Sequence, residues 1–467
     1  MTAVDRSDAT DPRIVSRSPQ EPDDVVVATS AVAPSEVADR ATRARAAQRD
    51  WVEVTALARA TALGAAADAV ANAAEELGTL LTREIGKPQL ESKAEVGRAV
   101  AILRFYAQQA LAADGETFPG NGPAASFVMT RRQPYGLATL VTPWNFPVMI
   151  PTWKAAPALA SGNAVLLKPA PAATACALRL GELLANALPN DLFQVLPGGA
   201  QTGSAAMDAG DVISFTGSTP VGKAIVAQAH QAGIPVQAEM GGLNASIVLP
   251  DADPDRTAAT IAAAAMGYAG QKCTATSRVI VVGANPRFIQ ALVAAVRALP
   301  TGDPRDPATV VGPVISEAAR EQVLEATGQA QRDGGQILTG GSSAAPGWSV
   351  QPTLVGGLEA SSWAAQTEVF GPFCVVLPVG SIDEAVRVAN DTPYGLSTAV
   401  FTGDLDQVLA LPARLRSGMV RINAATTGVD FHMPFGGMGE SGRGERELGT
   451  AAANFFTRQQ TITVQPR

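Results

Sequence analysis

The chain has 467 residues, of which 46% are hydrophobic and 17% are charged, and its formal net charge at pH 7 is −8. A chain of this length divides into two or three domains rather than folding around one core. Its acidic balance, without a block of like charge, argues against nucleic acid or an anionic membrane surface as a partner. No apolar stretch approaches the roughly 20 residues that span a bilayer.

The N-terminus and the cysteines predict a cytoplasmic location. Residues 1–13 have no apolar core and therefore do not resemble a secretory signal. The three cysteines are an odd number at wide spacing, which suits a reducing compartment better than a disulfide framework. The two histidines lie far apart, and neither a CxxC nor an HExxH motif is present, so no metal site is expected.

Helical patterns fill the first part of the chain. Residues 35–84 are rich in alanine, with Leu, Val and Ile at helical spacing, and Gly86 and Pro88 follow them as stop signals. Residues 94–111 predict another helix, and the Gly/Pro-rich stretch 112–126 predicts a boundary.

Beyond residue 126, short β-type runs alternate with helical ones. Strands are predicted at 136–143, 164–169, 192–198 and 211–217. Helices are predicted at 151–161, 173–188 and 219–230. This alternation predicts a doubly wound parallel sheet. A second α/β block is expected from about 245 to 430, and residues 461–467 predict a lone edge strand.

Two segments have the context of a nucleotide site, because ligands bind at the carboxyl ends of strands in such sheets. Residues 215–222, FTGSTPVG, combine a strand, a glycine turn and a helix N-terminus that can hold a phosphate, although the full GxGxxG pattern is missing. Lys168 ends the strand AVLLK and can reach a phosphate or a ribose hydroxyl. An ordinary strand-to-helix turn and a solvated lysine are the alternatives.

Three residues are candidates for catalysis. Cys273 lies in GYAGQKCTATSR among small and polar residues, whereas a structural cysteine is a small hydrophobe. Glu239 ends an apolar run before a Gly-Gly turn and is either a satisfied buried acid or a general base with a raised pKa. Asn145 is flanked by Trp144 and Phe146 between two prolines, so its amide either caps a turn or faces an oxyanion.

Together these segments resemble the aldehyde dehydrogenase superfamily over nearly the whole chain. The matching stretches occur in the family's order: TPWNFP, LLKPA, FTGSTPVGK, AEMGGLNASIV, GQKCTATSR, TEVFGPF, NDTPYGLSTAVFT and PFGGMGESGRGERELG. The resemblance implies an α/β fold with a doubly wound, Rossmann-like cofactor domain, an α/β catalytic domain and a small β oligomerisation element. It places the dinucleotide-binding domain at 1–116 and 134–240, the catalytic domain at 241–440, and the oligomerisation arm and tail at 117–133 and 441–467.

The resemblance also implies a mechanism and an assembly. The thiolate of Cys273 attacks the aldehyde, and the Asn145 side chain and the Cys273 backbone N–H hold the oxyanion of the thiohemiacetal. Hydride transfer to NAD or NADP leaves a thioester, and Glu239 activates the water that hydrolyses it. Glu447 matches a second glutamate that is sometimes assigned to proton relay. A homodimer or a homotetramer is expected.

Cofactor contacts follow from the same resemblance. It assigns Glu368 to the nicotinamide ribose, Lys168 to the adenosine ribose and Ser218 to the pyrophosphate, and these contacts are completed by Trp144, Gly217 and Phe370. NAD-preferring members often carry a glutamate where this chain has Pro171. Without that carboxylate a 2′-phosphate meets no repulsion, so use of NADP, alone or beside NAD, is expected.

The segments that determine the substrate look most like the 2-oxoglutarate semialdehyde (2,5-dioxovalerate) dehydrogenase branch. That substrate carries a carboxylate, so the pocket should offer a cation or several donors. Polar candidates are Lys272, Thr274 and His432, although Lys272 has the alternative of pointing to solvent or pairing with a structural acid. An apolar or aromatic aldehyde is the alternative substrate, which would suit the remaining candidates Trp153, Val429 and Phe431.

Two other functions remain open. A CoA-acylating semialdehyde dehydrogenase uses the same cysteine but typically lacks the glutamate at position 239, so the presence of Glu239 favours hydrolysis. A non-catalytic structural or binding member would have lost Cys273, Glu239 or Asn145, and the chain has all three.

Overall fold

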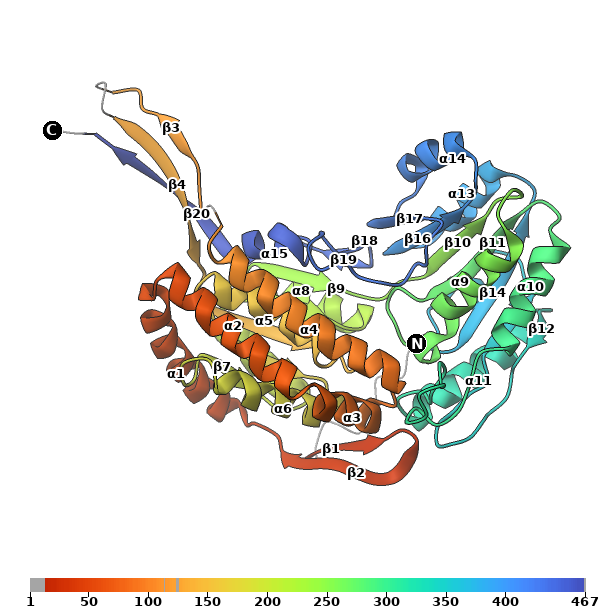
Figure 1. The fold of residues 1–467 in the computed structure, drawn as a ribbon, viewed down its shortest axis with the longest axis horizontal. Helices are drawn as coiled ribbons and strands as arrows, with labels where there is room; N and C mark the ends of the chain where they lie inside the picture. The colour runs from red at the N-terminus through yellow and green to blue at the C-terminus, as the bar shows by residue number, and fades with distance from the viewer. Residues whose placement is uncertain (1–12, 113, 123–125, 466–467) are drawn as a thin grey trace.

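The computed structural model of the chain describes residues 13–112, 114–122 and 126–465. The predicted absence of a secretory signal concerns residues that lie almost entirely outside this range, as do the last two residues of the predicted edge strand. The described chain forms two α/β units, each built on its own sheet, and a narrow third sheet that projects from the first unit (Figure 1). No helix in the described part of the chain is long and apolar enough to cross a membrane.

The helical region predicted at 35–84 consists of three helices, and a fourth follows. The first break is at Thr55, whose side chain accepts a hydrogen bond from Ala58 N and caps the second helix. The third helix ends at Gly86, which has a left-handed φ of 64°. The four helices are α1 (Pro34–Glu53), α2 (Ala56–Asn72), α3 (Ala74–Ile85) and α4 (Gln89–Gln109).

The first sheet is the predicted doubly wound parallel sheet. Its strand order is β19-β9-β8-β5-β6-β7, and every pair is parallel except β19 with β9. All residues of β5 and β6 are buried, as continuous apolar runs require. The strands are β5 (Leu137–Thr142), β6 (Ala164–Pro169), β7 (Phe193–Val195), β8 (Val212–Thr216), β9 (Val236–Glu239) and β19 (Gly442–Arg443). The helices between them are α5 (Met149–Ala160), α6 (Thr174–Ala185), α7 (Ala200–Ala209) and α8 (Thr219–Ala232).

An N-terminal hairpin lies against this unit and is not predicted by the sequence analysis. Its strands, β1 (Arg13–Ser18) and β2 (Glu21–Ser30), pair antiparallel. Ser16 Oγ donates to Glu84 Oε1 at 2.6 Å, and the Glu84 carboxylate also accepts two backbone N–H groups from the first turn of α6. One buried carboxylate therefore joins the hairpin, α3 and α6.

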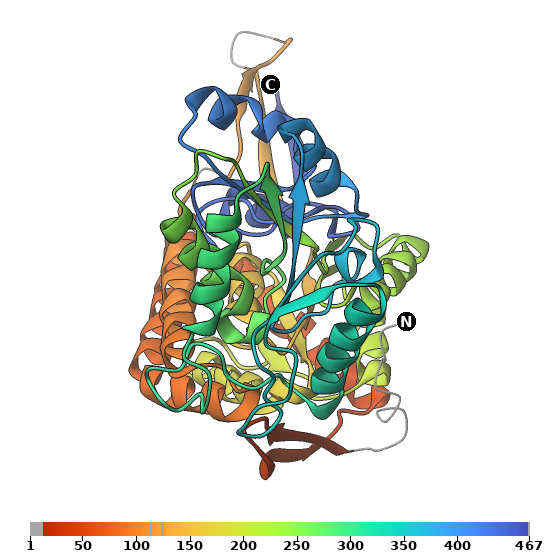
Figure 2. The same cartoon turned by 90° about the vertical axis from the view of Figure 1, so that its right-hand side faces the viewer.

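The second sheet is parallel apart from its edge strand β12, and its order is β12-β13-β14-β11-β10-β16-β17. Helices lie on both sides of it (Figure 2). Alternate residues of β11 enter different hydrophobic clusters on the two faces. The strands are β10 (Asn244–Val248), β11 (Thr276–Val282), β12 (Gln336–Thr339), β13 (Thr353–Gly356), β14 (Phe373–Val379), β16 (Ser397–Phe401) and β17 (Met419–Ile422). The helices are α9 (Pro254–Met266), α10 (Pro286–Arg297), α11 (Glu317–Arg332), α12 (Trp363–Gln366), α13 (Ile382–Asn390) and α14 (Leu405–Ala410).

The third sheet is antiparallel, with the order β20-β4-β3 (Figure 1). Its strands are β3 (Thr117–Pro119), β4 (Phe127–Pro134) and β20 (Thr457–Val464). Residues 461–464 of the predicted C-terminal edge strand belong to β20 and pair with β4. Residues 442–455, which the resemblance groups with the tail, lie on the first unit instead, because β19 pairs with β9 and α15 (Gly449–Phe455) packs against α5.

The two larger units meet at complementary edges of their sheets. Residues 240–243 link the carboxyl end of β9 to the amino end of β10, so these two edges face each other. Asn145 and Ser218 follow β5 and β8, between which the strand order of the first sheet reverses. Cys273 and Glu368 precede β11 and β14 at the amino edge of the second sheet. The predicted site residues therefore converge between the two units.

Candidate active site

A strained loop carries the candidate nucleophile. Cys273 follows the short 3-10 turn η3 (Gly267–Gly270), in which Tyr268 and Ala269 have left-handed φ values of 55° and 52°. Such conformations are costly for residues with a side chain and are found where surrounding structure enforces them. Gly270 also has a positive φ, and a Cβ there would lie 2.2 Å from Gly371 O. Only glycine lets this loop approach the loop before β14 so closely.

Cys273 differs from the other two cysteines in exposure. All three are free thiols, but Cys176 and Cys374 are buried whereas Cys273 is partly exposed. The surrounding protein, followed by the carboxylates of Glu239 and Glu368, raises the pKa of the Cys273 thiol to about 12. At neutral pH the thiol is therefore protonated in this structure, so its reaction requires that the proton be removed or the thiolate stabilised.

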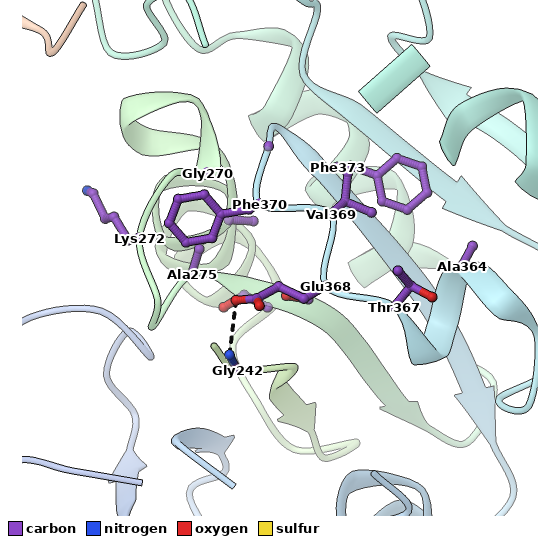
Figure 3. Close-up of a pocket in the computed structure, with 14 residues that line it drawn as sticks. Gly242, Gly270, Lys272, Ala275, Ala364, Thr367, Glu368, Val369, Phe370 and Phe373 are labelled. Carbon is purple, nitrogen blue, oxygen red and sulfur yellow. Dashed lines mark hydrogen bonds between the residues drawn. The ribbon is translucent and has the colours of Figure 1, made fainter. Parts of the chain in front are cut away.

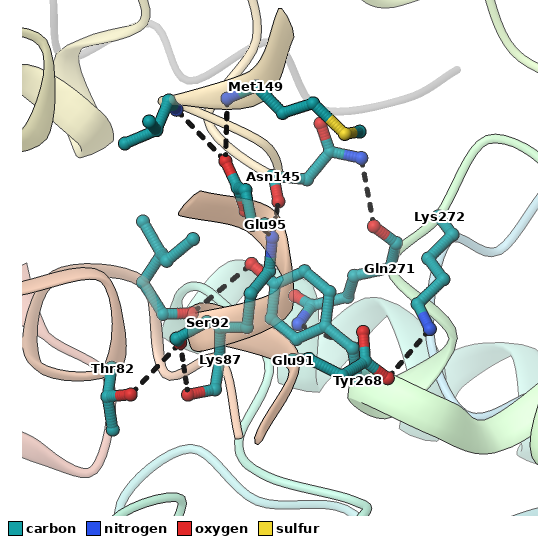
Figure 4. Close-up of polar contacts among 12 residues, drawn as sticks. Thr82, Lys87, Glu91, Ser92, Glu95, Asn145, Met149, Tyr268, Gln271 and Lys272 are labelled. Carbon is teal, nitrogen blue, oxygen red and sulfur yellow. Dashed lines mark hydrogen bonds and ion pairs between the residues drawn. The ribbon is translucent and has the colours of Figure 1, made fainter. Parts of the chain in front are cut away.

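Asn145 lies beside the nucleophile loop rather than only capping a turn. Its side chain is buried, and Nδ2 donates a hydrogen bond of 2.9 Å to the carbonyl oxygen of Gln271, two residues before Cys273 (Figure 4). An amide NH2 group has two N–H donors, so a second donor remains for a developing oxyanion. The backbone oxygen of Asn145 accepts from Lys87 Nζ at 2.7 Å.

Glu239 ends β9 as a buried carboxylate. Its Oε2 accepts the backbone N–H of Gly437 at 3.0 Å. Burial, followed by the charge of Glu447, raises the pKa of Glu239 well above its usual value, whereas Gly437 N–H, Arg446 and Lys154 act in the opposite direction. A carboxyl group with a raised pKa is suited to accept a proton near neutral pH. The general-base alternative therefore has a physical basis.

Lys154, which the sequence analysis does not single out, is a buried cation whose charge lowers the pKa of Glu239. It is fully buried on α5, and its ammonium donates to Glu447 Oε1 and, at 2.8 Å, to Ser214 Oγ. Burial lowers the pKa of Lys154, and the neighbouring Glu447 opposes that shift. The available signal is a single charge inside the apolar helix PTWKAAPAL, because a lysine in such a helix is buried only with a partner.

Glu368 and Phe370 lie on the loop before β14 and face the segment of Lys272 and Ala275 (Figure 3). Gly242 N donates to Glu368 Oε1 at 3.0 Å, and a Cβ on the preceding residue, Gly241, would lie 2.0 Å from Oε2. Burial raises the pKa of Glu368 to about 7, and the Gly242 N–H opposes that shift. An enclosed carboxylate with further acceptor capacity fits the hydroxyl groups of a ribose.

The other predicted cofactor residues lie along the carboxyl edge of the first sheet. Ser218 is the exposed N-cap of α8 and makes no side-chain capping bond, so the first N–H groups of α8 are available to a phosphate. Gly217 precedes it directly. Lys168 is the penultimate residue of β6 and donates to the carbonyl oxygen of Gly198 at 3.3 Å. Pro171 begins the 3-10 turn η2 (Pro171–Ala173) that follows.

An edge-to-face pair joins two predicted cofactor residues, one from each unit. The rings of Trp144 and Phe370 lie 5.8 Å apart at 85°. Phe370 has a left-handed φ of 53°, which turns its side chain out of the loop that also carries Glu368. The carboxylate of Glu368, the N–H groups at the start of α8 and the rings of Trp144 and Phe370 therefore lie where the two sheet edges meet. A dinucleotide offers hydroxyl groups, a diphosphate and flat rings to such groups.

The apolar substrate candidates belong to, or pack against, the large hydrophobic cluster of the first unit. Val429 and Phe431 border the same hydrophobic cluster as Cys273. Trp153 is buried on α5, with its ring 5.4 Å from that of Phe435. In the described structure Trp153 Nε1 has no hydrogen-bond partner.

The three polar substrate candidates differ in burial and in their partners. Thr274 is buried next to Cys273. Lys272 Nζ forms an ion pair with Glu91 at 2.7 Å, which is the structural alternative foreseen for it. His432 is exposed, with its ring 5.9 Å from that of Phe431. Within the described residues no cluster of His, Cys, Asp and Glu is arranged to hold a metal ion.

Residues 6–462 match the model of the aldehyde dehydrogenase family. The chain belongs to this family. It is an aldehyde dehydrogenase that uses NAD or NADP.

Its relatives cover nearly all of the sequence. This aldehyde dehydrogenase is 36% identical to alpha-ketoglutaric semialdehyde dehydrogenase of Bacillus subtilis over 96% of the chain and 94% of that protein. It is 38% identical to betaine aldehyde dehydrogenase of Cereibacter sphaeroides over 90% of the chain and 87% of that protein. Among solved structures, PnpE in complex with nicotinamide adenine dinucleotide superposes with a TM-score of 0.93 at 32% identity, covering 97% of this chain and 94% of that one.

Proposed function

We propose that this aldehyde dehydrogenase oxidises an aldehyde that carries a carboxylate, such as 2-oxoglutarate semialdehyde, to a carboxylic acid through a covalent adduct of Cys273. The observation that carries the covalent mechanism is the hydrogen bond from Asn145 Nδ2 to Gln271 O, which holds an amide donor beside the nucleophile loop. The similarity to alpha-ketoglutaric semialdehyde dehydrogenase supports the substrate class.

The first half of the reaction forms the adduct. Cys273 Sγ adds to the aldehyde carbon, and the free N–H of the Asn145 amide, with the backbone N–H of Cys273, stabilises the oxyanion that forms. In this structure the pKa of the Cys273 thiol is raised to about 12. For the thiolate to form near neutral pH, that pKa must decrease when substrate and cofactor bind. When bound, NAD(P) would accept a hydride from the carbon of the adduct. The group that remains on Cys273 is then a thioester.

Hydrolysis of that thioester needs a base. We assign this role to Glu239, whose raised pKa lets it accept a proton from water near neutral pH. Behind it, the buried pair of Lys154 and Glu447, with Ser214, provides a path by which the proton leaves the site. The charge of Glu447 raises the pKa of Glu239, which is consistent with such a relay.

The buried N–H of Trp153 supports a polar function for the substrate. A buried donor without a partner is costly unless a ligand or water satisfies it, and a carboxylate oxygen is a strong acceptor. The same ring, with Val429 and Phe431, is the feature that favours the alternative of an apolar or aromatic aldehyde.

We propose that the following residues bind NAD(P). Glu368 binds the nicotinamide ribose, Lys168 the adenosine ribose, and the turn of Gly217 and Ser218 the diphosphate, while Trp144 and Phe370 border the cleft. NADP is used at least comparably with NAD, because Pro171 gives the adenosine ribose no carboxylate.

We also propose the domain division and the assembly. The first unit binds the dinucleotide, the second carries the nucleophile, and the β3-β4-β20 sheet is an arm through which the chain forms a homodimer or homotetramer. Exposed apolar side chains on that sheet, including Phe118 and Phe127, support an interface there. Three free thiols are consistent with a reducing, cytoplasmic location.

A panel of aldehydes tests the proposal. Initial rates of nicotinamide reduction are measured with 2-oxoglutarate semialdehyde, an apolar aldehyde and an aromatic aldehyde, with each cofactor, with and without CoA. We expect the highest kcat/KM for the semialdehyde, the free acid as product, and no requirement for CoA. Trp153→Phe should raise KM for the semialdehyde more than for the apolar aldehyde.

Cys273→Ala, with Cys176→Ala and Cys374→Ala as matched controls, tests the nucleophile. Only the first should abolish turnover. Substantial turnover by Cys273→Ala would contradict the covalent mechanism, and a preference for the aromatic aldehyde would contradict the substrate class.

A further inference from the structure

We infer that the buried ion pair of Lys87 and Glu95 positions Asn145 and thereby sets the rate at which Cys273 adds to the aldehyde. The inference rests on the proposed function, because the place of Asn145 affects that rate only if an oxyanion forms beside Cys273. Neither member of the pair touches the nucleophile, so both are positioning residues.

Lys87 is held by four groups. The side chains of Lys87 and Glu95 are 0% and 1% exposed. The Lys87 ammonium donates to Glu95 Oε2 and, at 2.7 Å, to the backbone oxygen of Asn145, and it lies 3.7 Å from the ring centroid of Phe146 and 4.6 Å from that of Tyr268. A buried ammonium is tolerated only when its partners are fixed, so the cation holds the Asn145 carbonyl in one place.

The second oxygen of Glu95 holds the other end of the same loop. Glu95 Oε1 accepts the backbone N–H groups of Val148 and Met149 at 2.9 and 3.0 Å. These groups begin α5, and its N-cap residue, Val148, supplies no side-chain cap. The N–H groups at a helix start require acceptors, and here a carboxylate from another helix provides them. One ion pair therefore fixes the loop from Asn145 to Val148 at both ends.

The helix that carries Glu95 also holds the nucleophile loop. Glu91, one turn earlier on α4, accepts from Lys272, the residue before Cys273. Asn145 Nδ2 is in turn bound to Gln271 O. Figure 4 shows the contacts of both loops converging on the start of α4. The network therefore sets the distance between the oxyanion donor and the nucleophile, to which rates respond steeply.

A merely structural role makes a different prediction from a positioning role. If the pair only stabilised the fold, its removal would lower the melting temperature and affect all reactions of Cys273 alike. If it positions Asn145, its removal slows only reactions in which an oxyanion develops. Addition to an aldehyde develops one, whereas alkylation by iodoacetamide, which displaces iodide at carbon, does not.

The variant K87M/E95Q removes both charges at once and so leaves no buried charge unpaired. We expect its burst of reduced nicotinamide with aldehyde to slow by about tenfold to hundredfold, on the scale of displacing an oxyanion donor by up to about 1 Å. Alkylation of Cys273 by iodoacetamide, followed by mass spectrometry, should keep the parental rate. The matched control is K93M on the same helix, because Lys93 forms an exposed pair with Glu75 and the loss of that pair should leave the burst unchanged.

A mutant cycle with Asn145→Ala decides the question. If the pair acts through Asn145, K87M/E95Q causes no further loss of burst rate in the N145A background. An equal loss in both backgrounds, or a parental burst in the folded K87M/E95Q variant, overturns the inference. If that variant does not fold, Lys87→Arg replaces it in the cycle, since it keeps the cation but changes the donor geometry. A parent that reduces no nicotinamide with any carboxylate-bearing aldehyde contradicts the proposed function instead, so the two failures are distinct.

Discussion

Glu239 and Cys273 influence each other through charge. The carboxylate of Glu239 is the first charge, after burial, that raises the pKa of the Cys273 thiol. Removing it should therefore lower that pKa and increase the thiolate fraction at a given pH. At the same time, the thioester loses its base. One substitution should thus accelerate a reaction of the thiol and slow turnover.

For Glu239→Gln we expect faster alkylation of Cys273 by iodoacetamide at alkaline pH, where Glu239 is ionised in the parent. Its turnover should be slow, while the burst of reduced nicotinamide persists and an acyl group can be detected on Cys273 by mass spectrometry. The pH dependence of alkylation should move to lower pH than in the parent. Slower alkylation and loss of the burst would instead show that Glu239 removes the thiol proton.

Pro171 is expected to influence the choice of cofactor. Pro171→Glu adds an acceptor for the 2′-hydroxyl of NAD and a negative charge beside the 2′-phosphate of NADP. Each effect is worth about 1–3 kcal/mol, and every ~1.4 kcal/mol is a factor of ten, so the ratio of NAD to NADP efficiency should rise at least about tenfold. Thermal melts serve as the folding control, because proline also shapes the η2 turn. An unchanged ratio in a folded variant would mean that other residues set the preference.

At the level of elements, the clearest prediction concerns the start of α6. Glu84 accepts the N–H groups of Ala175 and Cys176 at 2.7 and 2.8 Å, so a residue of α3 caps α6. Glu84→Ala leaves the buried N–H of Cys176 and the partly buried N–H of Ala175 without an acceptor, at about 1–3 kcal/mol each, and should lower the free energy of unfolding by about 2–6 kcal/mol. Urea titration measures the change.

A matched control exists on the same two helices. Glu76 of α3 pairs with Arg179 of α6 at the surface, at 2.7 Å. Exposed pairs contribute little, so Glu76→Ala should cost less than about 1 kcal/mol. If Glu84→Ala and Glu76→Ala lowered the free energy of unfolding equally, the buried cap would contribute no more to stability than an exposed ion pair.

The elements also show what a sequence pattern can specify. Strands β5, β6 and β8 are continuous apolar runs ended by turn residues, and their prediction is confirmed because burial on both faces leaves that signature. The sequence does not predict the hairpin strand β2, EPDDVVVATS, because its polar and charged start carries no such pattern. The helical pattern over 35–84 does not separate its three helices, since neither Gly nor Pro marks the breaks at Thr55 and Ala73.

The candidate site shows the same limit for single residues. Cys273, Glu239 and Asn145 each lie in a local setting that is unusual for its residue type, so the sequence indicates them. Lys154 and Glu447 are far apart in the chain, and only the packing of α5 against the C-terminal segment makes them partners. Contacts of this kind leave no local pattern.

For the whole molecule, the projecting sheet predicts how the chain assembles. Phe118 and Phe127 are 44% and 38% exposed on β3 and β4. Replacing both with lysine should shift the mass measured by light scattering from an oligomer toward a smaller species. Leu57→Lys, at an exposed position of α2, is the matched control and should leave the mass unchanged. If both variants keep the parental mass, the sheet is not the interface.

The convergence of the two sheet edges has a genetic consequence. Asn145 and Glu239 lie on one unit and Cys273 and Glu368 on the other, but all four belong to a single chain, and the short link 240–243 joins the units. In a mixed assembly, a chain with Cys273→Ala and a chain with Glu239→Gln would each keep their own defective site. Two such alleles should therefore fail to complement each other, and co-expressing them should give no more activity than the two give separately.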